Sequence, residues 1–285
     1  MLRRRMMGKT KCTLTVYTTA FAQVVINGTT IQANSSGYAY FQLKKGTYSF
    51  SASKSGYTSR AGSVVVTSNQ TLSIVLSATP ISTIFLMHCN GDLTDEYGHK
   101  ATASGVARYV SGKFGQALNL DGSWHVHFDN SGFGDIIRDE SWTLEYWLYP
   151  ISNNLSNKYI VCSWYQDQWS FVTSAGPNGI APHMEVRDAE DVRAYGGTCN
   201  NRWNLNQWNH IAFVKYGMTY TVYCNGRGTD YPITYNRGRE VPYFDIGYKA
   251  DTGRNEGGFY IDEIRISKGA RYTSNFTPPS SQFSS

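Results

Sequence analysis

Acidic residues are missing from the first 80 positions of this 285-residue chain, and charged residues make up only 16% of the whole. Nine of the 26 basic residues lie in that acid-free stretch, five of them within residues 3–11, so all 21 acidic residues follow Pro80. A basic segment can bind nucleic acid or an acidic protein surface. We favour the protein surface for this half and treat residues 1–11 as a basic arm, although a solvated terminus is equally consistent with the pattern.

Long apolar runs and a clear secretion signal are also missing. No 18 consecutive apolar residues occur, so we expect no membrane insertion. Lys9 and Lys11 interrupt the stretch where a signal peptide would carry its apolar region, which favours a protein made in a cytoplasm. The five cysteines are odd in number, scattered and without a CxxC pair, so we expect them to be mostly free.

Catalytic motifs are the third absence. The sequence has no GxSxG elbow, no HExxH helix motif and no phosphate-binding loop. Glycosidases need two carboxylates that flank the scissile bond. The acidic stretch 185–191 does not supply them, because Glu185 and Asp188 would point to opposite faces of a strand. The sequence therefore predicts a protein that is not an enzyme.

Short alternating runs separated by glycine turns fill residues 12–77 and predict a small all-β sandwich. Its order of strands and turns, from VVING at 24–28 to LSIVL at 72–76, resembles the PEGA and carboxypeptidase-regulatory-like family of immunoglobulin-like modules. That resemblance implies a spacer or docking unit without catalytic residues. Residues 78–82 follow as a short linker.

The last strand of the second domain is visible at residues 259–266. Phe259, Ile261, Ile264 and Ile266 are expected to be buried, with polar residues between them. The alternation slips by one residue at Asp262–Glu263, which predicts a β-bulge.

The closing segment at 261–279, IDEIRISKGARYTSNFTPP, resembles that of laminin-G-like, concanavalin-A-like jelly-roll domains. Four further segments occur in the order that those domains show: KFGQALNLDG at 113–122, SWTLEYWLYP at 141–150, QWNHIAFVK at 207–215 and YTVYCNGR at 220–227. We therefore predict an all-β chain, an immunoglobulin-like sandwich followed by a jelly roll over residues 83–279 and a tail at 280–285. Trp142, Trp147 and Trp208 are expected in its core.

One structural Ca²⁺ is implied by the same resemblance. Related domains often hold it between an aspartate of an early D-x-x-G loop and the aspartate of the final IDE strand. Those positions match Asp95, with Gly98 three residues on, and Asp262, and Asp92 is a further candidate ligand. The loop differs from the commoner DSSGNG sequence of those domains. The alternative to a calcium site is an Asx-type turn with an acidic residue on the surface.

Carbohydrate is the second candidate ligand, because sugar faces stack on aromatic rings while amides and arginines read the hydroxyls. Three clusters have this composition, and each could equally pack beneath loops. Their candidate residues are Trp164, Tyr165 and Trp169, then Arg202 and Trp203, and finally Trp124.

The closing ISKG-AR-Y-T-NFTPP wording resembles that of bacteriophage virion proteins. It implies a non-catalytic protein on the virion surface, decorating capsid or tail, made in the host cytoplasm and released by lysis. The basic N-terminal half would contact other virion proteins, and the jelly roll would adhere to host or environmental glycans; self-association into a homo-oligomer is left open. The alternatives are a secreted bacterial carbohydrate-binding module or component of a glycan-active enzyme, and a structural virion protein without a ligand.

Overall fold

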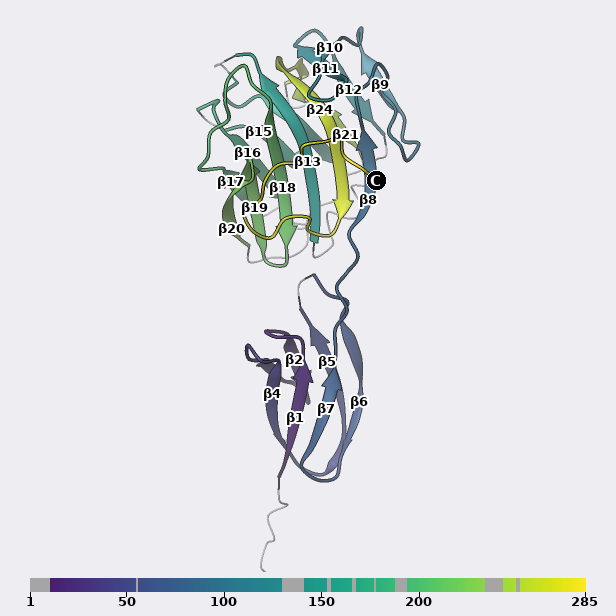
Figure 1. The fold of residues 1–285 in the computed structure, drawn as a ribbon, viewed down its shortest axis with the longest axis vertical. Helices are drawn as coiled ribbons and strands as arrows, with labels where there is room; N and C mark the ends of the chain where they lie inside the picture. The colour runs from purple at the N-terminus through teal and green to yellow at the C-terminus, as the bar shows by residue number, and fades with distance from the viewer. Residues whose placement is uncertain are drawn as a thin grey trace, which may run out of the picture. The chain divides into compact units, whose positions relative to one another are not determined.

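The computed structural model describes residues 11–54, 56–129, 141–152, 155–165, 168–176, 178–187, 194–233, 243–249 and 252–285. The chain divides into two compact units, with the break between Thr79 and Pro80 (Figure 1). Its regular structure in these ranges is entirely β-strand, which confirms the predicted all-β class. None of the described segments forms a helix with the length and apolar character needed to cross a membrane.

The smaller unit is a two-sheet sandwich. One sheet has the strand order β4-β1-β7 and the other β3-β2-β5-β6. Alternate residues of β1, among them Leu14 and Val16, are fully buried between the sheets, as their period of two predicts. The strands are β1 (Cys12–Thr18), β2 (Gln23–Ile26), β3 (Thr29–Gln32), β4 (Tyr38–Leu43), β5 (Gly46–Ser53), β6 (Arg60–Val66) and β7 (Gln70–Ile74).

The larger unit packs an eight-stranded sheet, β10-β11-β24-β13-β18-β19-β20 with β8 also paired to β24, against the seven-stranded sheet β17-β16-β15-β14-β21-β12-β9. Strands β22 and β23 form a separate two-stranded ribbon. The strands are β8 (Ser82–Met87), β9 (Ala101–Ser104), β10 (Tyr109–Ser111), β11 (Gln116–Asp121), β12 (His125–Phe128), β13 (Ser141–Pro150), β14 (Tyr159–Tyr165), β15 (Gln168–Ala175), β16 (Pro182–Arg187), β17 (Ala194–Thr198), β18 (Asn209–Tyr216), β19 (Thr219–Cys224), β20 (Arg227–Pro232), β21 (Phe244–Ile246), β22 (Tyr248–Lys249), β23 (Arg254–Asn255) and β24 (Gly257–Lys268).

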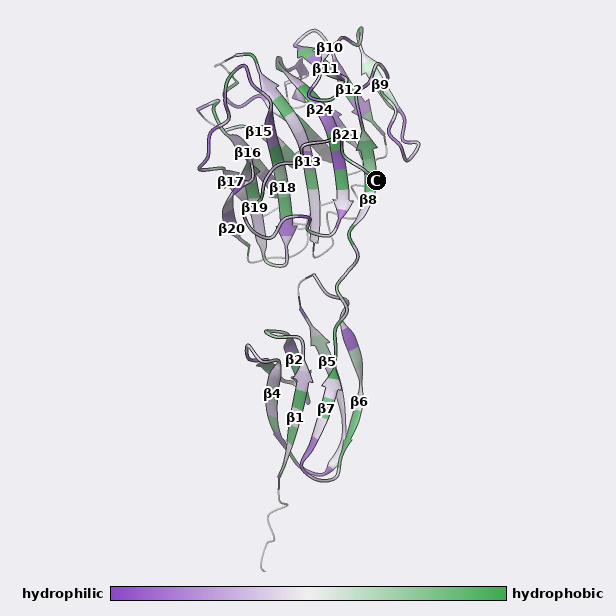
Figure 2. Ribbon diagram, in the orientation of Figure 1, coloured by the Kyte–Doolittle hydropathy of each residue, from purple (hydrophilic) through white to green (hydrophobic). Residues whose placement is uncertain are grey.

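Strand β24 joins the parts of the eight-stranded sheet. It pairs with β13 on one side, and on the other with β11 up to Ile261 and with β8 from Ile264 onward. At this changeover Glu263 and Ile264 stand where β13 offers only Tyr146, and Glu263 adopts a left-handed φ of 52°. The predicted bulge at Asp262–Glu263 is therefore confirmed. A hydrophilic band lies on β24 at mid-length in Figure 2.

Residues 270–285 form what we call the C-terminal strap, which returns across the outer face of the eight-stranded sheet and crosses β13 and β18 in Figure 1. The Tyr272 and Phe276 rings stack with centroids 3.6 Å apart and pack on β18 and β19. Phe283 is buried against Trp147, which lies on this outer face and not in the central core where we expected it. The chain after residue 279 is thus part of the domain, not a free tail.

Buried carboxylates hold the strap in place. Arg265 donates to Oε1 of Glu145 from Nη2 at 2.7 Å, and the Tyr272 hydroxyl donates to Oε2 at 2.7 Å. Nε2 of His210 lies 3.0 Å from the same Oε2. Burial disfavours the charged form of Glu145, but His210 and Arg265 outweigh it and lower the pKa of this carboxyl. Glu263 accepts the Phe283 backbone N–H at 2.7 Å.

Candidate functional site

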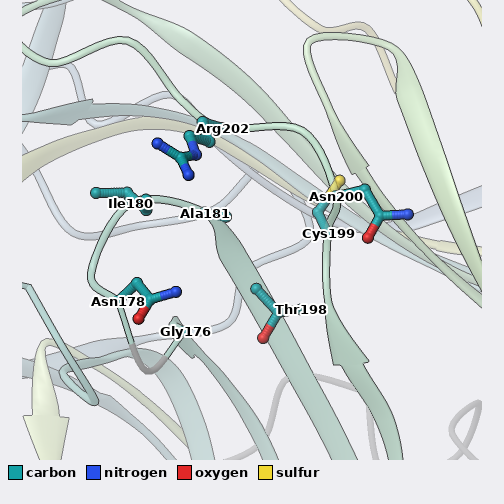
Figure 3. Close-up of a pocket in the computed structure, with 8 residues that line it drawn as sticks. All are labelled: Gly176, Asn178, Ile180, Ala181, Thr198, Cys199, Asn200 and Arg202. Carbon is teal, nitrogen blue, oxygen red and sulfur yellow. The ribbon is translucent and has the colours of Figure 1, made fainter.

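A cavity of about 240 Å³ opens at one end of the seven-stranded sheet, where the turn between β15 and β16 meets the end of β17 (Figure 3). The first wall is formed by Gly176 and residues 178–181, and the second wall is the segment 198–202. Eight residues line the cavity: Gly176, Asn178, Ile180, Ala181, Thr198, Cys199, Asn200 and Arg202.

Backbone hydrogen bonds join the two walls. The Cys199 N–H donates to the Pro182 carbonyl at 2.8 Å, and the Trp203 N–H donates to the Ile180 carbonyl at 3.1 Å. Gly176 permits a close approach, because a Cβ at this position would lie 2.7 Å from Cγ2 of Thr198. The shape of the cavity is therefore fixed by main-chain contacts, and the exposed side chains of Asn178 and Arg202 remain available to a ligand.

The second wall is also tied to β20 behind it. The Asn200 N–H donates to Oγ1 of Thr229 at 2.9 Å, and the amide of Asn201 donates to the Arg227 carbonyl at 3.4 Å. These contacts come from a strand of the opposite sheet, so the segment bridges the two layers of the sandwich. Such support suits a binding site, because it limits the ordering that a ligand would have to impose.

Polar groups of different kinds line the cavity. Asn178, Asn200 and Arg202 are exposed, and in Figure 3 the Arg202 guanidinium and the Asn178 amide lie on either side of Ile180, whereas the Asn200 amide points away from both. The Thr198 hydroxyl lies 2.8 Å from Nδ1 of His183. No Asp or Glu is among the lining residues that the structure describes. This set can donate and accept several hydrogen bonds but lacks the paired carboxylates of a glycosidase.

A family model described as the concanavalin A-like lectin/glucanases superfamily matches residues 120–274, more than half of the chain. The chain belongs to this superfamily. The match covers both walls of the cavity and the bulged strand β24. A search of curated proteins found no match.

Solved structures show the same superfamily fold. Domain 4 of AbnA, an extracellular arabinanase from Geobacillus stearothermophilus solved in complex with arabinotriose, has a TM-score of 0.52 at 20% identity, over 67% of this chain and 94% of that one. The botulinum neurotoxin serotype G binding domain has a TM-score of 0.51 at 16% identity, over 67% of this chain and 49% of that one. The chain thus spans about half the length of the toxin domain, and at these identities the likeness concerns the fold alone.

The superfamily fold places the predicted aromatic residues differently from our expectation. Trp124 is fully buried and its Nε1 donates to the Asn119 carbonyl at 2.8 Å, so it cannot stack on a sugar. Trp203 is 7% exposed and packs in the core behind the second wall. We predicted that both rings would contact a sugar. The structure places them in the hydrophobic core of the sandwich instead, where they serve packing. Among the predicted sugar-binding residues whose side chains the structure describes, Arg202 alone lines the cavity.

The remaining predicted cluster, that of Trp164, Tyr165 and Trp169, lies at the hairpin of β14 and β15. Trp164 pairs with Trp169 and Tyr165 with Gln168 along the backbone. The side chains of these residues lie outside the described part of the structure, and so does the acidic stretch 188–191. Their glycan-binding role stays a prediction.

The three aspartates predicted to bind calcium do not assemble into one group. Asp92 accepts the Thr94 N–H in an Asx-type turn at 3.1 Å, and Asp95 accepts the His99 N–H at 2.6 Å. Both line a second cavity of about 260 Å³, to which Asp262 does not contribute. In the described ranges, no three His, Cys, Asp or Glu side chains are placed to hold a metal ion. The donor set therefore does not fit the predicted site.

Asp262 makes its contact with a different segment. Its Oδ2 accepts the Phe114 N–H at 3.0 Å, and its Oδ1 is buried without a hydrogen-bond partner in the described structure. Burial raises the pKa of this carboxyl to about 7.

The first wall of the cavity was missed from the sequence. The segment 176–179 reads Gly-Pro-Asn-Gly between two strands, which is a strong turn signal. A turn signal alone does not say which other loop the turn will face. Only the amides and Arg202 of the facing segment 198–202 indicated a binding site from the sequence.

Proposed function

We propose that the chain binds glycans without transforming them, through the cavity between residues 176–181 and 198–202. The observation that carries this proposal is a rigid concave site lined by amides, a hydroxyl and a guanidinium, with no carboxylate among its lining residues. Membership of a lectin and glucanase superfamily supports it. So does the likeness to an arabinanase domain that was solved with an oligosaccharide.

The test is binding of the full chain to a panel of immobilised polysaccharides. Asn178→Ala should weaken binding about fivefold, because a neutral hydrogen bond contributes about 1 kcal/mol. Asn204→Ala is the matched control, since Asn204 is exposed two residues beyond Arg202 and does not line the cavity. Absence of binding to the whole panel, or equal loss in both variants, contradicts the proposal.

We further propose that the protein is displayed on a bacteriophage particle, with the smaller unit attached to other virion proteins. The closing segment at 261–279 and the acid-free composition of residues 1–80 support this assignment. Deleting residues 1–80 should abolish incorporation into particles. All seven tryptophans follow residue 80, so their fluorescence verifies that the truncated protein is folded. Full occupancy of particles by the truncated protein would overturn the assignment.

An accessory domain of a secreted glycan-active enzyme is the second candidate function. It is favoured by the arabinanase domain, which belongs to an extracellular enzyme. Release of reducing ends from a polysaccharide of the panel would support activity in this chain itself. Binding without release supports the non-catalytic proposal.

A further inference from the structure

Arg202 is the single charged residue among those that line the cavity. It is exposed, and it has no ion pair or hydrogen bond with any described residue. Most exposed arginines in folded proteins face water, but this one borders a concavity whose other polar groups are neutral. The described lining of the cavity therefore carries one positive charge that no neighbouring group neutralises. An anionic group on the ligand would neutralise it.

A carboxylate fits a guanidinium better than a neutral hydroxyl does. The planar fork of arginine donates two parallel hydrogen bonds to the two oxygens of a carboxylate. The lining contains no acidic side chain that would repel such a group or compete for Arg202. Glu185 of the neighbouring strand β16 lies 3.4 Å from Nε2 of His183 through its Oε1 and does not line the cavity.

Thr198 indicates that the ligand also carries hydroxyl groups. A carboxylate beside Nε2 of His183 favours the tautomer with its proton on that nitrogen, which leaves Nδ1 as an acceptor. The Thr198 hydroxyl then donates to Nδ1 at 2.8 Å, and its lone pairs remain to accept a hydrogen bond from a ligand hydroxyl. A simple inorganic anion would not use this acceptor, whereas a sugar hydroxyl would.

The size of the cavity limits what enters it. Its volume of about 240 Å³ lies below the range of roughly 300–1,000 Å³ that is typical of pockets for drug-sized ligands. A single sugar unit, at a chain end or a branch, therefore suits the cavity better than a stretch of polysaccharide.

We propose that the cavity binds a carboxylate-bearing sugar of the uronic-acid class, with its carboxylate on Arg202 and its hydroxyls on Thr198 and Asn178. This inference rests on the proposed glycan-binding function and names its ligand class.

The experiment uses the full chain and a panel in which each uronate-containing polysaccharide is paired with its carboxyl-reduced form. Sulfated polysaccharides are included to separate carboxylate recognition from general attraction to anions. The variants are Arg202→Gln, which removes the charge, and Arg202→Lys, which keeps the charge but loses the planar fork. Arg227→Gln is the matched control, because Arg227 is exposed on the neighbouring strand β20 and does not line the cavity.

We expect carboxyl reduction of the ligand to weaken binding of the natural chain about tenfold or more, as the loss of a charge-assisted hydrogen bond implies. Arg202→Gln should weaken binding of the carboxylated form by the same factor and leave binding of the reduced form unchanged. The two losses should not add, since they remove one interaction from its two sides. Arg202→Lys should bind with intermediate affinity, and Arg227→Gln like the natural chain.

Equal binding of the carboxylated and reduced forms overturns this inference while the proposed glycan-binding function stands. Preference for sulfated polymers, or equal losses in Arg202→Gln and Arg227→Gln, also overturns it, because recognition would then be a general charge effect. Absence of binding to every member of the panel overturns both. Unchanged melting curves of the variants, followed by tryptophan fluorescence, verify that each outcome concerns binding and not folding.

Discussion

Asp262→Asn should stabilise the larger unit above neutral pH. The Asp262 side chain is fully buried, one oxygen accepts the Phe114 N–H, and the other has no hydrogen-bond partner in the described structure. Burial raises the pKa of the carboxyl from 3.8 to about 7. A carboxyl with a raised pKa binds its proton more tightly in the folded state. Its contribution to stability is therefore fully present below about pH 4 and is lost as the pH rises to about 7.

The size of the effect follows from this window. Each pH unit between the unfolded and folded pKa contributes about 1.4 kcal/mol, and less close to the folded pKa, so lowering the pH from 8 to 5 should stabilise the natural chain by about 2.5 kcal/mol relative to the variant. For a unit of this length, 1 kcal/mol shifts the melting temperature by roughly 2–4 °C. The variant should therefore gain roughly 5–10 °C on the natural chain between pH 5 and pH 8.

Melting curves followed by tryptophan fluorescence measure this directly, because all seven tryptophans lie in the larger unit. Asp92→Asn is the control, since it removes the same charge from an exposed position. Identical pH dependence of the natural chain and Asp262→Asn refutes the reasoning. The calcium ion that the sequence predicts is tested alongside. If Ca²⁺ raises the melting temperature of the natural chain at pH 8 but not that of Asp262→Asn, this carboxylate binds a metal ion and is not a protonated, unpaired acid.

Two further predictions concern the C-terminal strap. Glu145→Gln should lower the free energy of unfolding by about 3–5 kcal/mol, because it leaves Arg265 and His210 buried without the carboxylate that they contact. A loss below about 1 kcal/mol, measured by urea titration, would contradict this. Phe283→Ala should cost up to about 3 kcal/mol and speed hydrogen exchange in β8, because the Phe283 ring packs on Leu86 of that strand; unchanged exchange would show that the strap is dispensable.

The fold was largely predictable because its main signals are local. Alternation along 259–266 predicts the buried apolar side chains, and Phe259, Ile261 and Ile264 are indeed inaccessible. It does not predict that Asp262 and Glu263 between them are buried too. The one-residue slip predicts the bulge, because a strand has a period of two and any extra residue must be absorbed where the pattern breaks. The five cysteines, which we expected to be mostly free, are all buried and none of them forms a disulfide.

The alternation of residues along a strand does not predict which other segment will cover a face of its sheet. Alternation in β13 correctly separates Glu145 and Trp147 from their neighbours, but it does not say that a later segment will bury them. The same limit explains the two corrected tryptophans. A tryptophan in a polar loop has the same local sequence whether its ring faces water or the core, and the core residues that bury it come from distant strands.

The cavity shows why its chemistry can vary independently of the fold. Its walls are joined by main-chain hydrogen bonds, from Cys199 to Pro182 and from Trp203 to Ile180. Asn178 and Arg202 make no side-chain hydrogen bond or ion pair to the rest of the described chain, so replacing them costs the sandwich little. Because the backbone carries the shape and these side chains carry the recognition, ligand choice at this end of the sandwich depends on a few exposed groups that no strand pattern constrains.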